Sequence, residues 1–352
     1  MKPAEVNMSF VMLSLLPTSG WVPPLWNPDT WLCLLILPAM RNQTQVSEFI
    51  LLGLSHVQRL QHLLFISLLL LYLTVLLGNG AIVATVISEP QLHKPMYFFL
   101  GNLSCLDIFY STVTVPKMLS VFLLGHQPIS FGGCLAQLHF FHFLGSTEAV
   151  LLATMAYDRW VAICNPLRYP LVMSPRACLL LAVASWATGF VYALMHSVMT
   201  SQLTFCHQNH IHHFFCDVKP LLDLACSSTT LNMILLNTVT TAIALGSFTL
   251  TALSYLYILS FVCQKVQCQE GRWKLFSTCT SHLTTVALFY IPVLFSYTPP
   301  SSGSSHKRDM QVSLVYSAVT PALNPWIYTL RNQEVKSALK KMLGRKLFPG
   351  AK

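Results

Sequence analysis

Charged side chains are scarce in this sequence. Asp, Glu, Lys and Arg together make up only 9% of the 352 residues, whereas 54% are hydrophobic. A soluble domain usually carries about 25% charged residues. So small a charged fraction cannot cover a water-exposed surface, which excludes an ordinary soluble globular protein and favours lipid as the surrounding solvent.

Acidic residues are scarcer than basic residues, with 12 Asp and Glu against 21 Lys and Arg. A basic excess is also typical of nucleic-acid binding. Here, however, the charges lie between apolar runs and near the C-terminus, with no basic domain interleaved with aromatics. The positive-inside distribution of membrane proteins explains this pattern better. We therefore expect membrane lipid as a partner and no nucleic acid.

Seven apolar runs are long enough to cross a membrane, which requires roughly 20 mostly apolar residues. Backbone polar groups in lipid must be satisfied internally, so each run is predicted to be a helix. The expected fold is an all-α membrane protein, a seven-transmembrane helix bundle. The predicted spans are Leu63–Ile87, Met96–Met118, Leu138–Val161, Ala177–Val198, Met233–Val262, Phe276–Phe295 and Val312–Leu330.

The sequence lacks the signatures of several functional classes. No internal repeat is evident, which argues against a transporter built from inverted repeats, the main alternative for such a chain. The predicted seventh span has no Lys for a retinal Schiff base, and His139–Phe143 offers no acid for an amine ligand. No nucleophile motif and no His residues at metal-ligand spacing lie at a membrane depth that would support an enzyme site. We therefore predict no enzymatic activity and no metal centre.

The orientation follows from the basic residues. Fourteen of the 21 Lys and Arg fall on the side of the C-terminus. The C-terminus is therefore predicted to be cytoplasmic, and the N-terminus extracellular, in a multi-pass plasma-membrane protein. The expected organisation is an outer tail at 1–61, with an atypical Pro-interrupted extension at 1–39, a seven-helix domain at 62–331, and a cytoplasmic segment at 332–352. That last segment is predicted to form a short amphipathic helix with one apolar face, made by Val335, Leu339, Met342 and Leu343.

Sequence motifs follow these spans in a fixed order. Gly78-Asn79-Gly80 lies in the first span, Met155-Ala-Tyr-Asp158-Arg159 ends the third, Ser254-Tyr255 ends the fifth, and Pro321-Ala-Leu-Asn324-Pro325-Trp-Ile-Tyr328 closes the seventh. Together these blocks resemble the olfactory receptors of the rhodopsin-like G-protein-coupled class, from about 42 to 347, and look closest to the family-twelve group. Trp160 departs from the family's usual Tyr or Phe, and the long N-terminus is atypical.

The resemblance implies an odorant receptor that activates a heterotrimeric stimulatory olfactory G protein and raises cyclic AMP. Its pocket is expected between the outer halves of spans three, five and six. Each apolar residue there, taken alone, is typical of core packing, but together they describe a mainly apolar cavity for small volatile molecules. The predicted lining is Phe141, His142, Gly145, Ser146, Val239, Thr240, Ile243, Tyr290, Val293 and Tyr297.

A coupling switch is implied at the inner end. Taken alone, an Asp-Arg pair at a helix end indicates a surface ion pair of little energetic worth. In the context of the resemblance it indicates a latch that frees Arg159 when the helices rearrange. Pro325 cannot donate its backbone hydrogen bond and is a plausible hinge. The predicted switch residues are Asp158, Arg159, Tyr255, Asn324, Pro325 and Tyr328.

Four polar residues lie at central depth in the predicted spans: Asp107, Glu148, Asn79 and Asn324. Polar groups inside lipid are usually functional. Two carboxylates in one core cannot both stay charged unaided. The resemblance implies an inner sodium site, and a proton shared by the acids is a second possibility. The structural alternative is one neutral, hydrogen-bonded acid.

Four cysteines lie in predicted outer segments, where disulfides persist. The residues alone leave three pairings open, and the resemblance implies Cys134–Cys216 and Cys206–Cys226. His213-Phe-Phe-Cys216-Asp217 also resembles a metal site, but a disulfide-bonded Cys216 would be a poor ligand. Asn42-Gln-Thr44 is a predicted glycosylation site on the outer tail.

Overall fold

The computed structural model describes residues 46–52, 58–206, 209–266, 268–297 and 305–347. Within its helices, the side chains of 58–60, 269–278, 294–297, 305–309, 330–331 and 343–347 are not described. The chain divides into two compact units, Met1–Thr44 and Gln45–Lys352. All of the described residues belong to the second unit. The N-terminal extension and Asn42 lie outside the described residues.

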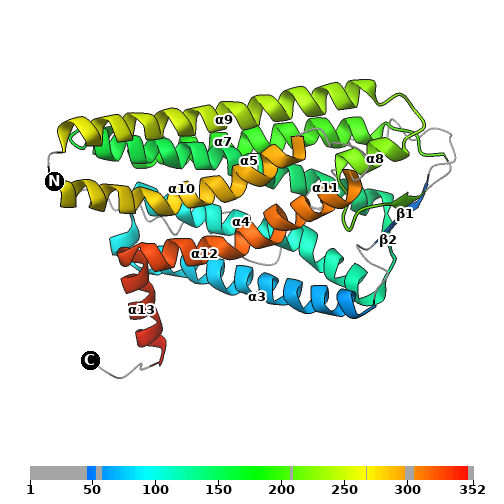
Figure 1. The fold of residues 1–352 in the computed structure, drawn as a ribbon, viewed down its shortest axis with the longest axis horizontal. Helices are drawn as coiled ribbons and strands as arrows, with labels where there is room; N and C mark the ends of the chain where they lie inside the picture. Colours follow the sequence, from blue (N-terminus) through cyan, green and yellow to red (C-terminus); the bar gives the residue numbers. More distant parts are fainter. Residues whose placement is uncertain (1–45, 53–57, 207–208, 267, 298–304, 348–352) are drawn as a thin grey trace, which may run out of the picture. The chain divides into compact units, whose positions relative to one another are not determined.

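Long helices lie side by side in the second unit (Figure 1). They are α3 (Gln58–Ser88), α4 (Pro95–Leu124), α5 (Phe131–Cys164), α7 (Pro175–Ser201), α9 (Thr230–Lys265) and α10 (Gln269–Tyr297). The seventh span consists of α11 (Ser305–Leu314), the π-helical turn η4 (Val315–Val319) and α12 (Thr320–Arg331). Short η3 (Pro90–Leu92) and α6 (Tyr169–Val172) lie in connections. The predicted helical bundle is confirmed.

Four of the described helices are long and apolar enough to cross a membrane by length and composition alone: α3 (over Gln61–Ser88), α4, α7 and α9. In α10 the side chains are described only over 279–293, and this part is an apolar helix, Cys279–Val293. The helices of the third, sixth and seventh spans carry buried polar side chains such as Glu148, His282 and Asn324. Those side chains lower the hydropathy of a helix while facing the bundle interior.

Capping residues explain where two helices begin. Ser130 Oγ accepts the Gly133 backbone N–H at 3.1 Å, and Ser174 Oγ accepts the Ala177 N–H at 3.4 Å. Such caps satisfy amide groups that have no partner within the helix. Because Ser130 provides this cap, α5 begins seven residues before the predicted start at Leu138. Hydropathy alone missed this first turn, which contains Gly132 and Gly133.

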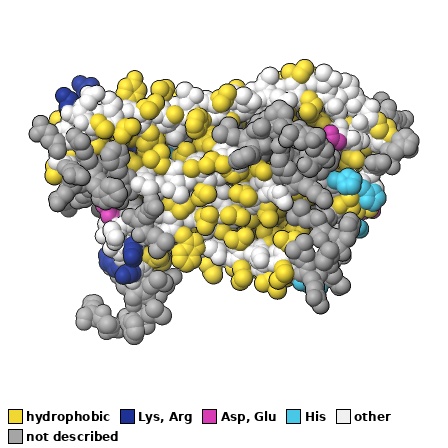
Figure 2. Space-filling model, viewed as in Figure 1, with side chains coloured by type: hydrophobic (Ala, Val, Ile, Leu, Met, Phe, Trp, Pro, Cys, Tyr) yellow, Lys and Arg dark blue, Asp and Glu magenta, His cyan; other side chains and the backbone are white. Residues whose placement is uncertain are grey.

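Hydrophobic side chains cover the outside of the helices as well as the inside. In α3, Leu63, Leu70 and Leu77 are 63%, 60% and 73% exposed. Figure 2 shows such side chains along the length of the bundle. An apolar exterior of this extent is unfavourable in water and favourable against lipid. Phe99, Leu103, Leu151 and Leu152 are fully buried in the interior.

A small sheet covers one end of the unit. Its strands are β1 (Glu48–Leu51), β2 (Gln127–Ser130) and β3 (His210–Ile211), in the order β2-β1-β3. In β1, Phe49 is fully buried against the rings of Phe131 and Phe205. The sequence analysis predicted no strand in the tail, because four residues without a helical period carry too little signal. This strand joins the tail to two distant loops.

The opposite end carries α13 (Gln333–Leu347), the amphipathic helix that the sequence predicts. Val335 is buried, Leu339 and Met342 are half-buried, and the side chain of Leu343 lies outside the described residues. Two ion pairs fasten the helix to the turn between α3 and α4: Lys94–Glu334 at 2.7 Å and Lys341–Glu89 at 2.8 Å. The hydrogen bond from Lys94 lowers the pKa of Glu334.

Candidate functional site

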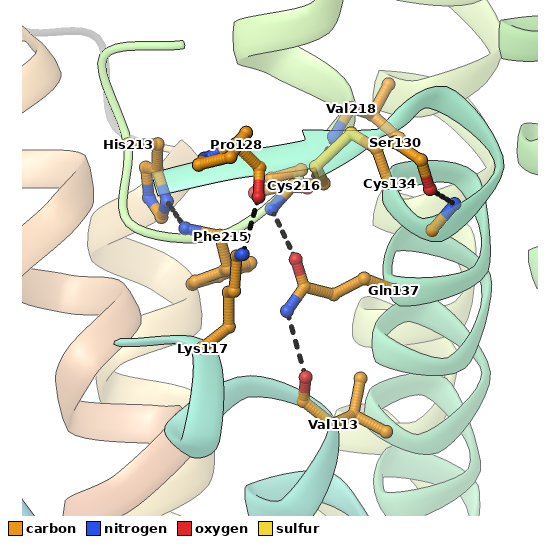
Figure 3. Close-up of a disulfide and its surroundings, with 12 residues drawn as sticks. Val113, Lys117, Pro128, Ser130, Cys134, Gln137, His213, Phe215, Cys216 and Val218 are labelled. Carbon is orange, nitrogen blue, oxygen red and sulfur yellow. Dashed lines mark hydrogen bonds between the residues drawn. A yellow bond between two sulfur atoms is a disulfide. The ribbon is translucent and has the colours of Figure 1, made fainter. Parts of the chain in front are cut away.

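The loop between α7 and α9 is tied to the top of α5. Disulfides join Cys134 to Cys216 and Cys206 to Cys226, which are the pairs that the resemblance implies. The buried amide of Gln137 lies one turn below Cys134 (Figure 3). Its Oε1 accepts the Cys216 N–H, and its Nε2 donates to the Val113 carbonyl, both at 2.9 Å. Gln137 therefore connects the loop, α5 and α4.

Two aromatic residues of this loop, Phe214 and Phe215, are fully buried. The Phe215 ring lies 4.7 Å from that of Phe141, which stacks on Tyr110 at 5.2 Å. The loop thus inserts an apolar wedge above the predicted pocket. Phe141 was predicted as a pocket residue, whereas Phe215 was not, because nothing in a loop sequence shows which side chains turn inward.

A polar contact lies beside this wedge. His142 Nε2 is 3.1 Å from Asp217 Oδ1, and Asp217 also accepts the Val218 N–H at the start of α8 (Val218–Leu224). Burial alone would raise the pKa of Asp217. The hydrogen bond and charge of His142, the charge of His213 and the Val218 amide outweigh that effect and lower the pKa to about 2. Asp217 is therefore an anion that holds His142 in place.

The predicted pocket residues of α9 and α10 lie in two groups. Thr240 Oγ1 is 2.5 Å from the hydroxyl of Tyr192 on α7. Deeper, Tyr290 donates to Ser247 Oγ at 2.7 Å, and Ile243 and Val293 pack against the same core cluster as Tyr290.

Four predicted pocket residues remain: Gly145, Ser146, Val239 and Tyr297. Ser146 donates to its own helix at His142 O (2.6 Å), and Gly145 faces the Tyr110 hydroxyl. Val239 is half-buried, and the side chain of Tyr297 lies outside the described residues. Phe141 and His142 therefore stand under the loop, and Tyr290, Ile243 and Val293 stand below them.

Two of the four central polar residues, on α4 and α12, are in direct contact. Asn324 Nδ2 donates to Asp107 Oδ2 at 2.9 Å. Asn79 Nδ2 donates to the Val75 and Pro321 carbonyls at 3.2 and 3.1 Å. Glu148 is 2% exposed and lies within electrostatic reach of Asp107. In each of these four residues, one side-chain oxygen has no hydrogen-bond partner within the described structure. These atoms are Asn79 Oδ1, Asp107 Oδ1, Glu148 Oε1 and Asn324 Oδ1.

Near the C-terminal end of α5, Asp158 and Arg159 form an ion pair at 2.7 Å. Asp158 is only 1% exposed, so this is not a solvated surface pair. Its second oxygen accepts the hydroxyl of Tyr169 in α6 at 2.8 Å. Burial, followed by the neighbouring Asp158 charge, raises the pKa of Tyr169, so this phenol stays protonated and donates. The sequence analysis had not assigned Tyr169 a role.

The other predicted switch residues lie on neighbouring helices. The Tyr255 hydroxyl is 2.7 Å from His282 Nδ1, which joins α9 to α10. Tyr328 is buried, and Pro325 follows Asn324 within α12. His282 was not predicted, since a single His in an apolar helix carries no signal by itself.

Three features define a seven-helix membrane receptor. They are a bundle of membrane-crossing helices, a disulfide-tied loop packed on the aromatic ring of Phe141, and a buried Asp-Arg pair at the far end. A family model described as olfactory receptor matches residues 68–346. Human olfactory receptor 12D3 is 58% identical over 309 residues, which cover 88% of this chain and 98% of that protein. Human olfactory receptor 12D1 is 56% identical, over 88% and 97% of the two chains. Rat olfactory receptor 1f45 is 46% identical, over 88% and 98%.

The chain therefore belongs to the olfactory receptor family. The resemblance to this family, and within it to the family-twelve receptors, is confirmed. The protein is a multi-pass membrane receptor and not an enzyme.

Proposed function

We propose that the receptor binds small volatile, mainly apolar odorants beneath the disulfide-tied loop and activates the heterotrimeric stimulatory olfactory G protein, which raises cyclic AMP. The observation that carries this proposal is the course of α5. One continuous helix holds Phe141 and His142 under the loop and Asp158 and Arg159 at its inner end. At about 1.5 Å per residue, its 34 residues extend about 50 Å.

The mechanism is a population shift. An odorant that binds the active arrangement more tightly moves the equilibrium toward that arrangement. The contacts that must change are the Asp158–Arg159 pair and the Tyr169 hydrogen bond that restrains it. Release of Arg159 would expose its guanidinium to a G-protein helix.

We propose a plasma-membrane location with the N-terminal side outside and the C-terminus in the cytoplasm. Both disulfides and the small sheet occupy the same end of the unit, and disulfides are stable in an oxidising environment. The basic α13 occupies the other end (Figure 1). Its lysines suit the anionic inner leaflet.

We further propose that the central polar group binds a sodium ion. The donors fit a hard monovalent cation, because two carboxylates and two amides each offer an oxygen with no other partner in the described structure. Bound sodium would offset one of the two negative charges of Asp107 and Glu148, and a contracted active state would expel it.

The decisive experiment for the receptor function is a panel of volatile odorants applied to cells that express the full chain together with the olfactory G protein. Cyclic AMP should rise for a subset of compounds and stay flat in cells without the receptor. Surface labelling verifies delivery. A receptor that reaches the surface yet raises cyclic AMP with no compound would contradict the proposal.

A further inference from the structure

Two buried polar atoms on α7 have no partner within the described structure: His196 Nε2 and Thr200 Oγ1. Both residues are only 1% exposed. They are four positions apart and therefore share one helix face. A buried polar group without a hydrogen bond is costly, so each such group in a folded protein calls for an explanation.

Other hydroxyls of the same helix are satisfied locally. Thr188 donates to the Ala184 carbonyl at 2.8 Å, and Ser197 donates to the Ala193 carbonyl at 2.7 Å. This bond to the fourth preceding carbonyl is the usual solution for Ser and Thr inside a helix. Thr200 does not make it, and so its hydroxyl remains available to another group.

The polar neighbours of His196 are already engaged. The Tyr192 ring lies 4.7 Å from the His196 ring, but the Tyr192 hydroxyl contacts Thr240. The His142 ring lies 5.7 Å from it, but His142 Nε2 contacts Asp217. His196 thus adjoins the predicted pocket at His142, on a helix that the sequence analysis did not include in the lining.

We propose that His196 and Thr200 form a polar subsite that binds the hydroxyl group of an alcohol odorant. This inference rests on the proposed odorant-binding function and names the ligand class. A hydroxyl both donates and accepts. It therefore satisfies Thr200 Oγ1 and His196 Nε2 whichever nitrogen of His196 carries the proton, whereas an ether or carbonyl oxygen only accepts.

The surrounding charges disfavour ionic ligands. The His142–Asp217 contact places one basic and one acidic group beside His196, both within its electrostatic reach. A carboxylate ligand would be repelled by Asp217, and an ammonium ligand would compete with His142. The subsite therefore selects a neutral ligand with one hydroxyl and an apolar skeleton that fits against Phe141 and Tyr290.

The test uses matched trios of volatile compounds, in which each linear, branched or monocyclic skeleton is supplied as the alcohol, its methyl ether and its hydrocarbon. Cyclic AMP is measured in cells that express the full chain. We expect the alcohols to be about tenfold more potent than their ethers and hydrocarbons, which corresponds to about one hydrogen bond. Thr200→Val and His196→Phe should each remove most of that advantage while leaving the hydrocarbon response unchanged.

Thr188→Val is the matched control, because it makes the same substitution in the same helix at an exposed hydroxyl. It should leave all potencies unchanged, and Thr200→Ser should retain the preference for alcohols. Surface labelling normalises each variant, and Thr200→Val decides the matter if His196→Phe is not delivered.

Equal potency across the trios in the unmodified receptor would overturn the subsite, as would an equal loss for all three compounds in Thr200→Val. Either result leaves the odorant receptor function standing. A receptor that is silent to every compound contradicts that function itself, and the subsite with it.

Discussion

Gly78 on α3 lies directly against Pro325 on α12. A Cβ atom added at Gly78 would stand 2.8 Å from the Pro325 Cβ and 2.9 Å from its Cγ, closer than real Cβ contacts. The first and seventh spans therefore approach each other at Pro325 only because position 78 has no side chain. Asn79, the next residue, donates to the Pro321 carbonyl one turn away from Pro325.

Gly78→Ala should destabilise the receptor, by about 1–3 kcal/mol, because the added methyl group forces the two helices apart. Gly80→Ala is the control, since a Cβ at Gly80 meets no atom within 4 Å. Thermal unfolding of purified receptor in detergent should show a lower Tm for Gly78→Ala and an equal or higher one for Gly80→Ala. Equal Tm values for both variants would mean that the close approach is unimportant.

Gln137→Leu should weaken the attachment of the loop between α7 and α9. The change removes both hydrogen bonds and leaves the buried Cys216 N–H without its Gln137 partner, and a buried unsatisfied group costs about 1–3 kcal/mol. Surface delivery and Tm should both fall, whereas Gln202→Leu, at an exposed position, should change little. Since Gln137 and Cys134 both hold Cys216, adding Cys134→Ser should lower Tm by less than the sum of the single effects. Strict additivity would show that the two contacts act independently.

Arg159→Ala should abolish the odorant response while surface expression persists, because the guanidinium is proposed to contact the G protein. Asp158→Asn should raise basal cyclic AMP, since it removes the charge that holds Arg159. Arg176→Ala, at an exposed position at the start of α7, is the matched control and should respond normally. A normal dose–response curve in Arg159→Ala would reject the coupling role.

Asp107→Asn and Glu148→Gln should each reduce the sodium dependence of the receptor and shift its basal activity, because either change removes half of the negative charge at the proposed ion site. Cyclic AMP is measured with sodium replaced by a large organic cation at constant ionic strength. Asp223→Asn, an exposed acid on α8, should behave like the unmodified receptor. A shared proton instead predicts dependence on pH with little dependence on sodium. Insensitivity of the unmodified receptor to the exchange, with both variants unchanged, would leave the acids a structural role.

The sequence by itself determined the membrane bundle, because an apolar run about 20 residues long has no stable structure in lipid other than a helix. It also determined the amphipathic α13 from the spacing of Val335, Leu339 and Met342. The ordered motifs were sufficient to indicate the family. These features depend on local composition and period, which a sequence displays directly.

Only the tertiary structure decided which polar groups meet. His142 and Asp217 are 75 positions apart, and Asp107 and Asn324 are 217 apart. The cysteines alone allowed three pairings, and the fold brings the Cα atoms of the two bonded pairs to 5.3 and 6.0 Å. The β1 strand, the double hydrogen bond of Gln137 and the unpartnered atoms of His196 and Thr200 likewise depend on neighbours supplied by distant segments. Because a hydrogen bond depends on distances of a few ångströms between atoms, no local pattern in the chain specifies it.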